Sequence, residues 1–170
     1  MKVFSPIDYG RATWLTLLLV LFVSGVALAQ SPDPNAGKQL LLELAGSDDW
    51  DALLRHPKVR PQLQQLLGAA LPHLRDNLNV SGSVDVVGGD LTVTGNAPHQ
   101  GTEEEAVVCV STYNLEVSAA IYSKGIVTAY SRKKTYDELS RCIKDWVTLV
   151  NSKHRDRVQQ PKNVRMAVTK

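Results

Sequence analysis

The chain is poor in the residues from which metal and catalytic centres are built. Its 170 residues include two cysteines and four histidines, and none of them has the spacing of zinc ligands. The G-x-S-x-G, H-E-x-x-H, P-loop and dinucleotide-binding patterns are also missing. We therefore expect no metal site, no cofactor and no catalytic residues, and we predict that the protein is not an enzyme.

Long hydrophobic runs are rare, and the one that occurs lies at the N-terminus. Lys2 and Arg11 precede an apolar run from Trp14 to Val26, and Ala27-Leu28-Ala29 follows it. A charged start, a short apolar segment and an A-x-A site predict a signal peptide over residues 1–29. The alternative is a membrane anchor, because 18 uncharged residues just reach spanning length, but the small-residue site favours cleavage. No cysteine follows the run, which argues against a lipoprotein.

The predicted mature chain therefore begins at Gln30, and we expect it in the bacterial periplasm or secreted, with no membrane span after cleavage. Its charge is unevenly spread: Gln30–Ser131 carries a formal charge of −6, and Arg132–Lys170 carries +7. The basic end is either a solvated surface or a segment that steers the protein to an acidic partner. Nucleic acid is not an expected partner in that compartment.

Hydrophobic periodicity predicts an α+β fold. Apolar residues at steps of three and four over 59–78 indicate a helical stripe, which Pro72 must kink or break. The period changes to two at Asn79, and five short strands follow, joined by short turns that require antiparallel pairing. The expected strands cover residues 80–87, 91–94, 106–111, 115–122 and 126–131.

A C-terminal helix is expected to pack on this sheet. Thr135 and Glu138 form a capping-box pattern at its start, and an apolar stripe runs from Leu139 to Val150. The predicted organisation is a linker and short helix over 30–46, a single α+β domain over 47–152, and a basic, flexible tail over 153–170.

The two cysteines, Cys109 and Cys142, are expected to form a disulfide in an oxidising compartment. Cys109 lies in the most apolar strand and Cys142 on the inner stripe of the helix. A strand-to-helix bridge across the core would stabilise the fold by roughly 3–4 kcal/mol in the chain-entropy account.

The segment from Gly95 to Glu105 is the longest connection between expected strands, and long loops among short turns are often functional. Pro98 stiffens it, and His99 would project at its tip. His99 and the following glutamates could bind a metal, or His99 could act as a base near Cys109. Adjacent glutamates cannot all face one ion, however, and burial disfavours a reactive Cys109. The remaining alternatives are a rigid recognition loop and an ordinary polar loop.

The stretch from Leu91 to Ser123 resembles the periplasmic inhibitors of vertebrate lysozyme, the Ivy family. It has a strand, a loop with Pro98-His99, a strand, a turn, and a strand that ends in Ala-Ala-Ile-Tyr-Ser. The resemblance implies helices beside an antiparallel sheet, and a loop of pattern CKPHDC whose histidine enters the lysozyme cleft. Pro98 and His99 match that pattern, whereas Asn96-Ala97 and Gln100-Gly101 stand where its cysteines would be.

These observations together predict an exported, non-catalytic protein that binds another protein. The resemblance implies an inhibitor of a lysozyme-like, peptidoglycan-cleaving enzyme, with Asn96, Pro98, His99 and Gln100 as the partner-binding loop. The alternatives are an immunity protein against a delivered toxin and an envelope assembly or structural interaction module. The sequence does not determine the oligomeric state.

Overall fold

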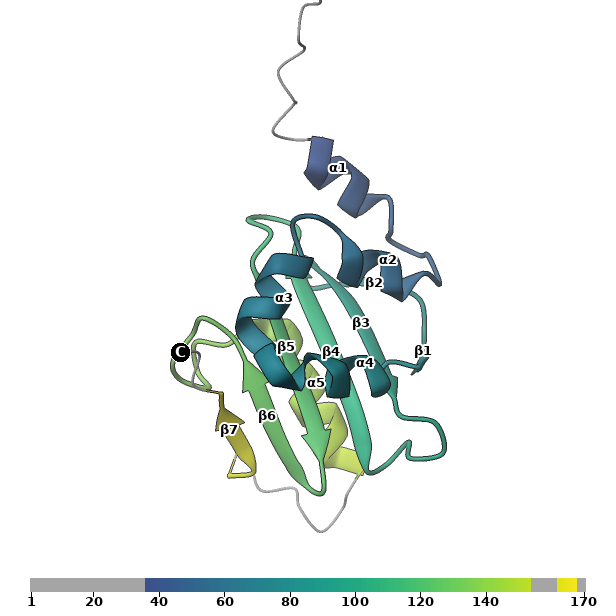
Figure 1. Cartoon of the computed structure of the whole chain (residues 1–170). Coiled ribbons are helices and arrows are strands. Elements are labelled where there is room, and N and C mark those ends of the chain that lie inside the picture. Colours follow the sequence, from purple (N-terminus) through teal and green to yellow (C-terminus); the bar gives the residue numbers. More distant parts are fainter. Residues whose placement is uncertain (1–35, 154–161, 168–170) are drawn as a thin grey trace, which may run out of the picture. The chain divides into compact units, whose positions relative to one another are not determined.

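The computed structural model describes residues 36–153 and 162–167, and the predicted signal peptide lies outside them (Figure 1). Short helices come first, then the sheet, then one longer helix, which confirms the predicted α+β class. The N-terminal helical elements are α1 (Ala36–Leu42), α2 (Trp50–Arg55), α3 (Arg60–Leu67), the 3-10 turn η1 (Gly68–Ala70) and α4 (Leu71–Asp76).

The predicted break in the helical stripe occurs at η1. Gly68 has a φ of +51°, a left-handed value that glycine adopts without steric cost. Pro72 then stands in the first turn of α4, where its missing N–H leaves no helical bond unmade. The stripe still continues across the break, because Leu63, Leu67 and Leu74 are all buried in one core.

The sheet has seven strands, in the order β1-β3-β4-β5-β6-β7, with β2 also paired to β3. All neighbouring strands are antiparallel except β6 and β7, which are parallel. The strands are β1 (Val80–Ser81), β2 (Asp85–Val87), β3 (Asp90–Asn96), β4 (Glu104–Ser111), β5 (Val117–Ser123), β6 (Ile126–Tyr130) and β7 (Val164–Met166).

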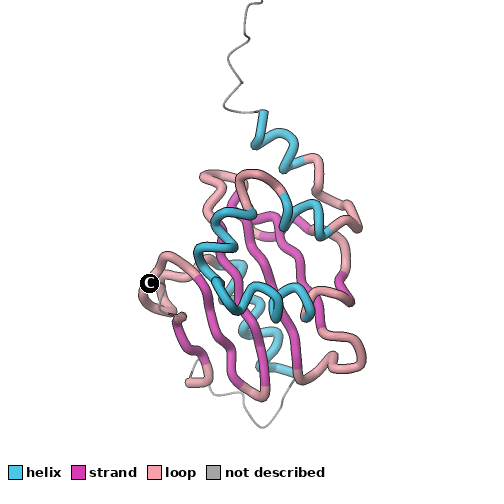
Figure 2. Tube along the Cα trace, viewed as in Figure 1, coloured by secondary structure: helices cyan, strands magenta, loops and turns pink. Residues whose placement is uncertain are grey.

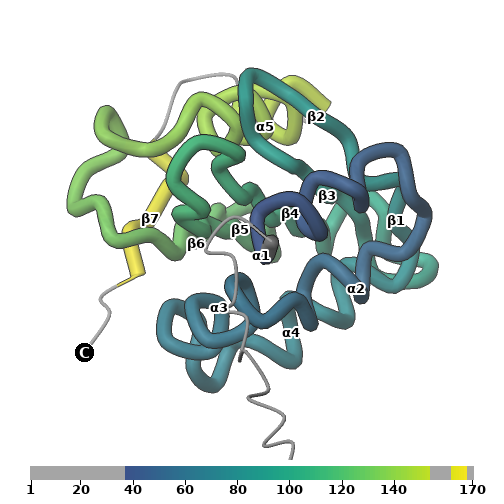
Figure 3. The backbone as a smooth tube through the Cα atoms, turned by 90° about the horizontal axis from the view of Figure 1, so that it is seen from above, coloured from purple at the N-terminus to yellow at the C-terminus, as the bar shows by residue number. Residues whose placement is uncertain are grey.

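Both faces of the sheet are covered by helices (Figures 1 and 2). Seen along the strands, α3 and α4 lie on one side of the sheet and α5 (Arg141–Lys153) on the other (Figure 3). Alternate residues of β4 divide between the two cores: Val108 packs with the N-terminal helices, and Val107 packs with α5. This explains why the strand reads as a continuous apolar run rather than an alternating one.

The expected count of about five strands was too low, partly because the segment 80–87 is split. Gly82, Ser83 and Val84 interrupt it, and β1 and β2 each pair separately with β3. Val84 leaves the sheet and is fully buried. Its N–H donates to Ser47 O at 2.7 Å, and its carbonyl accepts from Gly46 N at 2.7 Å. The backbone of Val84 therefore bonds to Gly46 and Ser47 rather than to β3, which divides the expected strand.

The other unexpected strand, β7, lies in the segment predicted to be a flexible tail. Its parallel pairing is anchored at both ends, by Val127 N–H to Asn163 O at 2.9 Å and Ala167 N–H to Ala129 O at 2.8 Å. The Asn163 side chain also donates to Asn151 Oδ1 at 2.8 Å and to Gly125 O at 3.1 Å. Because α5 separates β6 from β7 in the chain, β7 can run parallel to β6.

The C-terminal helix begins at Arg141, later than the predicted start at Thr135. Oε2 of Glu138 accepts hydrogen bonds from the N–H and the hydroxyl of Thr135, but these bonds close a turn ahead of the helix. The helix itself is capped by Ser140, whose Oγ accepts from Ile143 N–H at 3.3 Å.

The predicted disulfide between Cys109 and Cys142 is confirmed and joins β4 to α5. Both cysteines are buried, at 1% and 4% exposure. The hydroxyl of Thr92, across from Cys109 on β3, lies 3.2 Å from the sulfur of Cys142. The bridge therefore fixes the longer helix to the middle of the sheet.

Candidate functional site

The connection between β3 and β4, residues Ala97–Glu103, is the candidate binding element, and we call it the hook. It is shorter than the predicted loop, because β3 continues to Asn96 and β4 begins at Glu104. Gly95 lies within β3, where any Cβ would approach Val80 O to 2.9 Å. A side chain at this position would push β1 away from β3. The hook leaves the sheet at one end of the strands and is exposed from Pro98 to Glu103.

The tip of the hook is a β-turn that carries His99 at its corner. Gln100 N–H donates to Ala97 O at 3.0 Å, which closes the four-residue turn. Pro98 occupies its second position and His99 its third, with a φ of +63°. A proline followed by a left-handed residue is the pattern of a type II turn. This turn holds the imidazole of His99 at the exposed tip.

Asn96 supports the hook from its base. Its side-chain Nδ2 donates to Ala97 O at 2.9 Å. A Cβ built on Gly101 would lie 3.4 Å from Nδ2 and 3.5 Å from Cγ of Asn96, so the two residues face each other across the base. Of the four residues predicted to bind a partner, Pro98, His99 and Gln100 are exposed, whereas Asn96 is half-buried and turned toward the hook.

Of the three consecutive glutamates after the tip, Glu104 and Glu105 begin β4, so their side chains point to opposite faces of the sheet. Glu103 is exposed. Glu104 faces α4, where it meets His73 at 2.8 Å. Glu105 faces α5, where it pairs with Lys153 at 2.7 Å. The structure therefore does not gather His99 and these carboxylates around one ion, and it overturns the alternative of a metal site there.

The alternative in which His99 acts as a base near Cys109 is also overturned. Cys109 is bonded to Cys142 and buried, so it offers no thiol to a base. Within the described residues, one group of ligand-type atoms comes close together, and it consists of Asp90 with these two sulfurs. Because both sulfurs are in the disulfide, neither is a thiolate ligand.

Sequence reasoning missed a cluster at the base of the hook. Glu104 accepts hydrogen bonds from Ser123 Oγ at 2.6 Å, His73 Nε2 at 2.8 Å and Asn77 Nδ2 at 3.4 Å. Burial alone would raise the pKa of Glu104, but these hydrogen bonds and the charge of His73 together lower it. No local pattern marks such a cluster, because its members come from α4, its C-terminal cap, β4 and β5.

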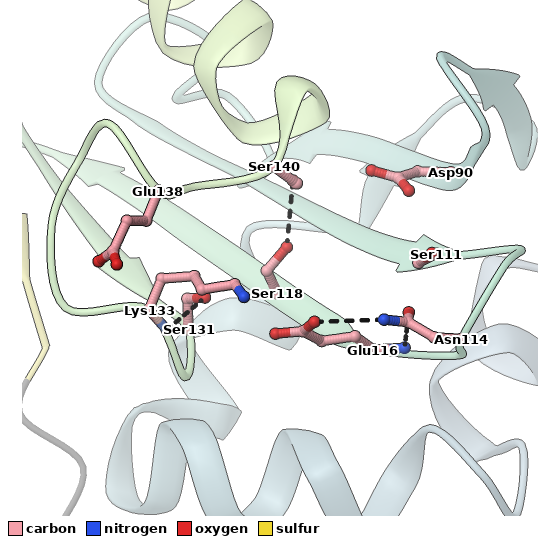
Figure 4. Close-up of a pocket in the computed structure, with 9 residues that line it drawn as sticks. All are labelled: Asp90, Ser111, Asn114, Glu116, Ser118, Ser131, Lys133, Glu138 and Ser140. Atoms are coloured by element: carbon pink, nitrogen blue, oxygen red, sulfur yellow. Dashed lines mark hydrogen bonds between the residues drawn. The ribbon is translucent and has the colours of Figure 1, made fainter.

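A pocket of about 220 Å³, lined by polar and charged residues, lies at the other end of the strands (Figure 4). It is bordered by the first residue of β3, Asp90, and the last of β4, Ser111. Two of its side chains are within hydrogen-bond distance across it, since Ser118 Oγ lies 3.5 Å from Ser140 Oγ. Burial, followed by the charge of Glu116, raises the pKa of Asp90. The pocket is thus separate from the hook and contains no histidine.

No helix among the described residues is long and apolar enough to cross a membrane. No curated protein and no solved structure matches the chain. The model of one protein family does match, over residues 58–153, and its description is inhibitor of vertebrate lysozyme (Ivy). The match covers more than half of the chain and includes the hook, the cluster at its base, the disulfide and the whole of α5. It extends well beyond the stretch from Leu91 to Ser123 that resembles the family in sequence. The chain belongs to the Ivy family.

Proposed function

We propose that the mature chain is an exported inhibitor of a lysozyme-like, peptidoglycan-cleaving enzyme, and that the hook is its inhibitory element. The family supports a protein-binding, non-catalytic role. The observation that supports the hook as the inhibitory element is the exposed His99 at the corner of a closed turn, with Pro98 before it. We propose a lysozyme-like enzyme as the target, without specifying which one.

The chemistry of the target suits an imidazole. Most glycoside hydrolases use two carboxyl groups on either side of the bond they cleave. Imidazole nitrogens donate hydrogen bonds to carboxylates, and a protonated imidazole adds a charge of opposite sign. In the proposed mechanism, His99 hydrogen-bonds the catalytic carboxyl groups, while Pro98 and Gln100 fill the adjacent sugar-binding space. The substrate is then excluded from the cleft.

The hook is suited to this role because it is ordered before binding. Each loop residue that must be fixed on binding weakens the affinity. Here the turn at residues 97–100 is already closed, and Glu103 N–H and Glu104 N–H both donate to Gln100 O at 3.0 Å. The hook reaches this order without a disulfide of its own, since the two cysteines of the chain are paired elsewhere.

The test is the lysis of peptidoglycan by a panel of lysozymes, with and without the oxidised mature chain, residues 30–170. His99→Asn is the informative variant, because asparagine tolerates a positive φ but lacks the imidazole. We expect near-stoichiometric inhibition by the wild-type protein and its loss in His99→Asn. Tyr113→Ala is the matched control: Tyr113 is 91% exposed, beyond the opposite end of β4.

The competing roles give different results in the same assay. An immunity protein would inhibit one delivered peptidoglycan-cleaving toxin but none of the panel. An envelope module would inhibit no hydrolase and would bind its partner equally well with His99→Asn. Unchanged inhibition by His99→Asn would show that the hook is not the inhibitory element.

A further inference from the structure

We propose that Glu104 is the positioning residue of the hook: it holds the hook in its binding geometry without touching the partner. This inference rests on the proposed function of the hook. Glu104 is the first residue of β4, and its side chain is 14% exposed. It therefore lies below the exposed tip, and its effect on a partner must act through the hook.

The backbone of Glu104 closes the hook from both directions. Its N–H donates to Gln100 O at 3.0 Å, and its carbonyl accepts from Ala97 N–H at 3.0 Å. These bonds connect one residue to the beginning and the middle of the hook. A shift of Glu104 along or across the sheet would therefore move the turn that carries His99.

The side chain of Glu104 fixes that backbone to two other elements. His73 and Asn77 belong to α4 and its C-terminal cap, and Ser123 ends β5. All three contact the carboxylate of Glu104 within hydrogen-bond distance. The hook is thus clamped between the helical layer and the next strand. Hydrogen bonds to an ionised acceptor are about twice as strong as neutral ones, so the clamp depends on the charge.

The neighbouring turn adds a further contact to the same end of the hook. Lys124 N–H, in the turn between β5 and β6, donates to Glu103 O at 3.3 Å. Ser123 and Lys124 are consecutive, so the turn holds the hook through the Glu104 side chain and the Glu103 backbone together. Loss of the Ser123–Glu104 bond is expected to loosen both contacts.

Glu103 provides a matched control, because it is the same residue type one position earlier. Its side chain is exposed, and no side-chain hydrogen bond or ion pair joins it to the described residues. Its backbone contacts survive a change of side chain. Glu103→Gln therefore removes the same charge from the same end of the molecule without removing the clamp.

The experiment compares Glu104→Gln with Glu103→Gln in two measurements. The first is the inhibition constant against the lysozyme that the wild-type chain inhibits best. The second is amide hydrogen exchange, which follows the N–H groups of Gln100, Glu103 and Glu104 with no enzyme present. We expect Glu104→Gln to weaken inhibition about tenfold and to speed exchange in the hook by a similar factor. Glu103→Gln should change neither by more than twofold.

A rescue variant separates positioning from a general loss of stability. The distance from a Cβ at Gly101 to Asn96 Cγ is 3.5 Å, so Asn96→Cys with Gly101→Cys places two sulfurs at the base of the hook within reach of each other. Because Asn96 belongs to the predicted partner-binding loop, inhibition is compared with the cross-linked parent, relative to which Glu104→Gln should weaken it less than twofold. Its effect on global unfolding should remain the same as in the chain without the cross-link.

Each result counts for or against the proposal. Equal effects of Glu104→Gln with and without the cross-link, or unchanged hook exchange in Glu104→Gln, would overturn it. If His99→Asn abolishes inhibition while Glu104→Gln does not weaken it, the proposed function stands and the positioning role fails. If the wild-type chain inhibits no lysozyme, the proposed function fails, and the exchange rates still show whether Glu104 holds the hook.

Discussion

The ammonium of Lys153 lies 2.7 Å from Oε2 of Glu105, and this pair joins the last turn of α5 to the beginning of β4. The Glu105 side chain is 7% exposed, whereas that of Lys153 is 41% exposed. Oε1 of Glu105 is buried and has no hydrogen-bond partner among the described residues. The carboxylate therefore depends on Lys153 for its compensation.

Removal of the lysine charge should destabilise the fold measurably. Lys153→Met keeps most of the side-chain volume but leaves the Glu105 carboxylate buried and unpaired, for which we expect a loss of about 1–3 kcal/mol. Arg141→Met is the control, because its pair with Asp145 on the same helix is exposed and should contribute less than about 0.5 kcal/mol. Urea unfolding at neutral pH measures both. Equal losses would show that burial of Glu105 does not determine the effect.

The disulfide should contribute to stability and not to inhibition. Its loop spans 33 residues, so the chain-entropy account predicts that Cys109→Ala with Cys142→Ala lowers the free energy of unfolding by about 3–4 kcal/mol. Both cysteines lie away from the hook, along β4 and on α5. Inhibition by the fraction that remains folded should therefore be unchanged. A weaker inhibition constant at a temperature where the variant is fully folded would contradict this.

The turn at His99 should show opposite effects on stability and on binding. A left-handed conformation costs a non-glycine residue roughly 1–2 kcal/mol, and glycine avoids this cost but has more entropy to lose on folding. His99→Gly should therefore leave stability unchanged or raise it by up to about 1 kcal/mol, while inhibition is lost. His99→Val should lower stability by about 1 kcal/mol or more. Thermal unfolding and the lysis assay on the same samples test the pair.

The acid sensitivity of the hook follows from Glu104. Its pKa is lower in the folded chain than its ordinary value of 4.5, so between these values the unfolded chain binds more protons and stability rises with pH. The contribution is complete above about pH 4.5 and is lost as the pH falls through the folded pKa. The stability difference between wild type and Glu104→Gln should therefore shrink between pH 6 and pH 3. A constant difference across this range would argue against the charged clamp.

Asp90, in the pocket at the far end, should behave in the opposite way. Burial and the nearby Glu116 raise its pKa above 3.8, so its ionised form is less favourable in the folded chain. Stability is lost as the pH rises through this raised value. Asp90→Asn should then be more stable than wild type at pH 7, with the advantage absent at pH 3. Unfolding at the two pH values gives the sign directly.

The sequence predicted the parts of the fold that depend on local pattern. The stripe of α5 carries a helical periodicity, the short apolar run of β4 has the length of a strand, and Pro72 excludes an unbroken helix, so each could be predicted from neighbouring residues. The disulfide followed from a pair of cysteines in a chain expected to be exported, and their places on a buried strand and a helix gave the position of the bridge. The exposed Pro98-His99 turn could also be predicted, because proline and long connections mark loops in any fold.

Apart from the start of α5, where Ser140 offers a second local cap, the remaining features depend on contacts between distant parts of the chain. The capping pattern of Thr135 and Glu138 was present, yet the helix begins later because Ser140 caps it instead. The parallel strand β7 depends on Asn163 reaching Asn151 and Gly125. His73 and Glu104 are 31 residues apart, and only the packing of α4 on the sheet brings them together. The strand β7 and the contact between His73 and Glu104 therefore cannot be predicted from a short stretch of the sequence.

The position of the hook has a consequence for how its binding specificity can change. β4 is buried on both faces and begins immediately after the hook, whereas residues 98–103 contribute nothing to either core. Substitutions at the tip therefore leave the hydrophobic packing of the domain intact. The domain, with helices on both faces of its sheet, can therefore serve as a scaffold for other short turns. The strands β3 and β4 would present each of these turns to a different cleft.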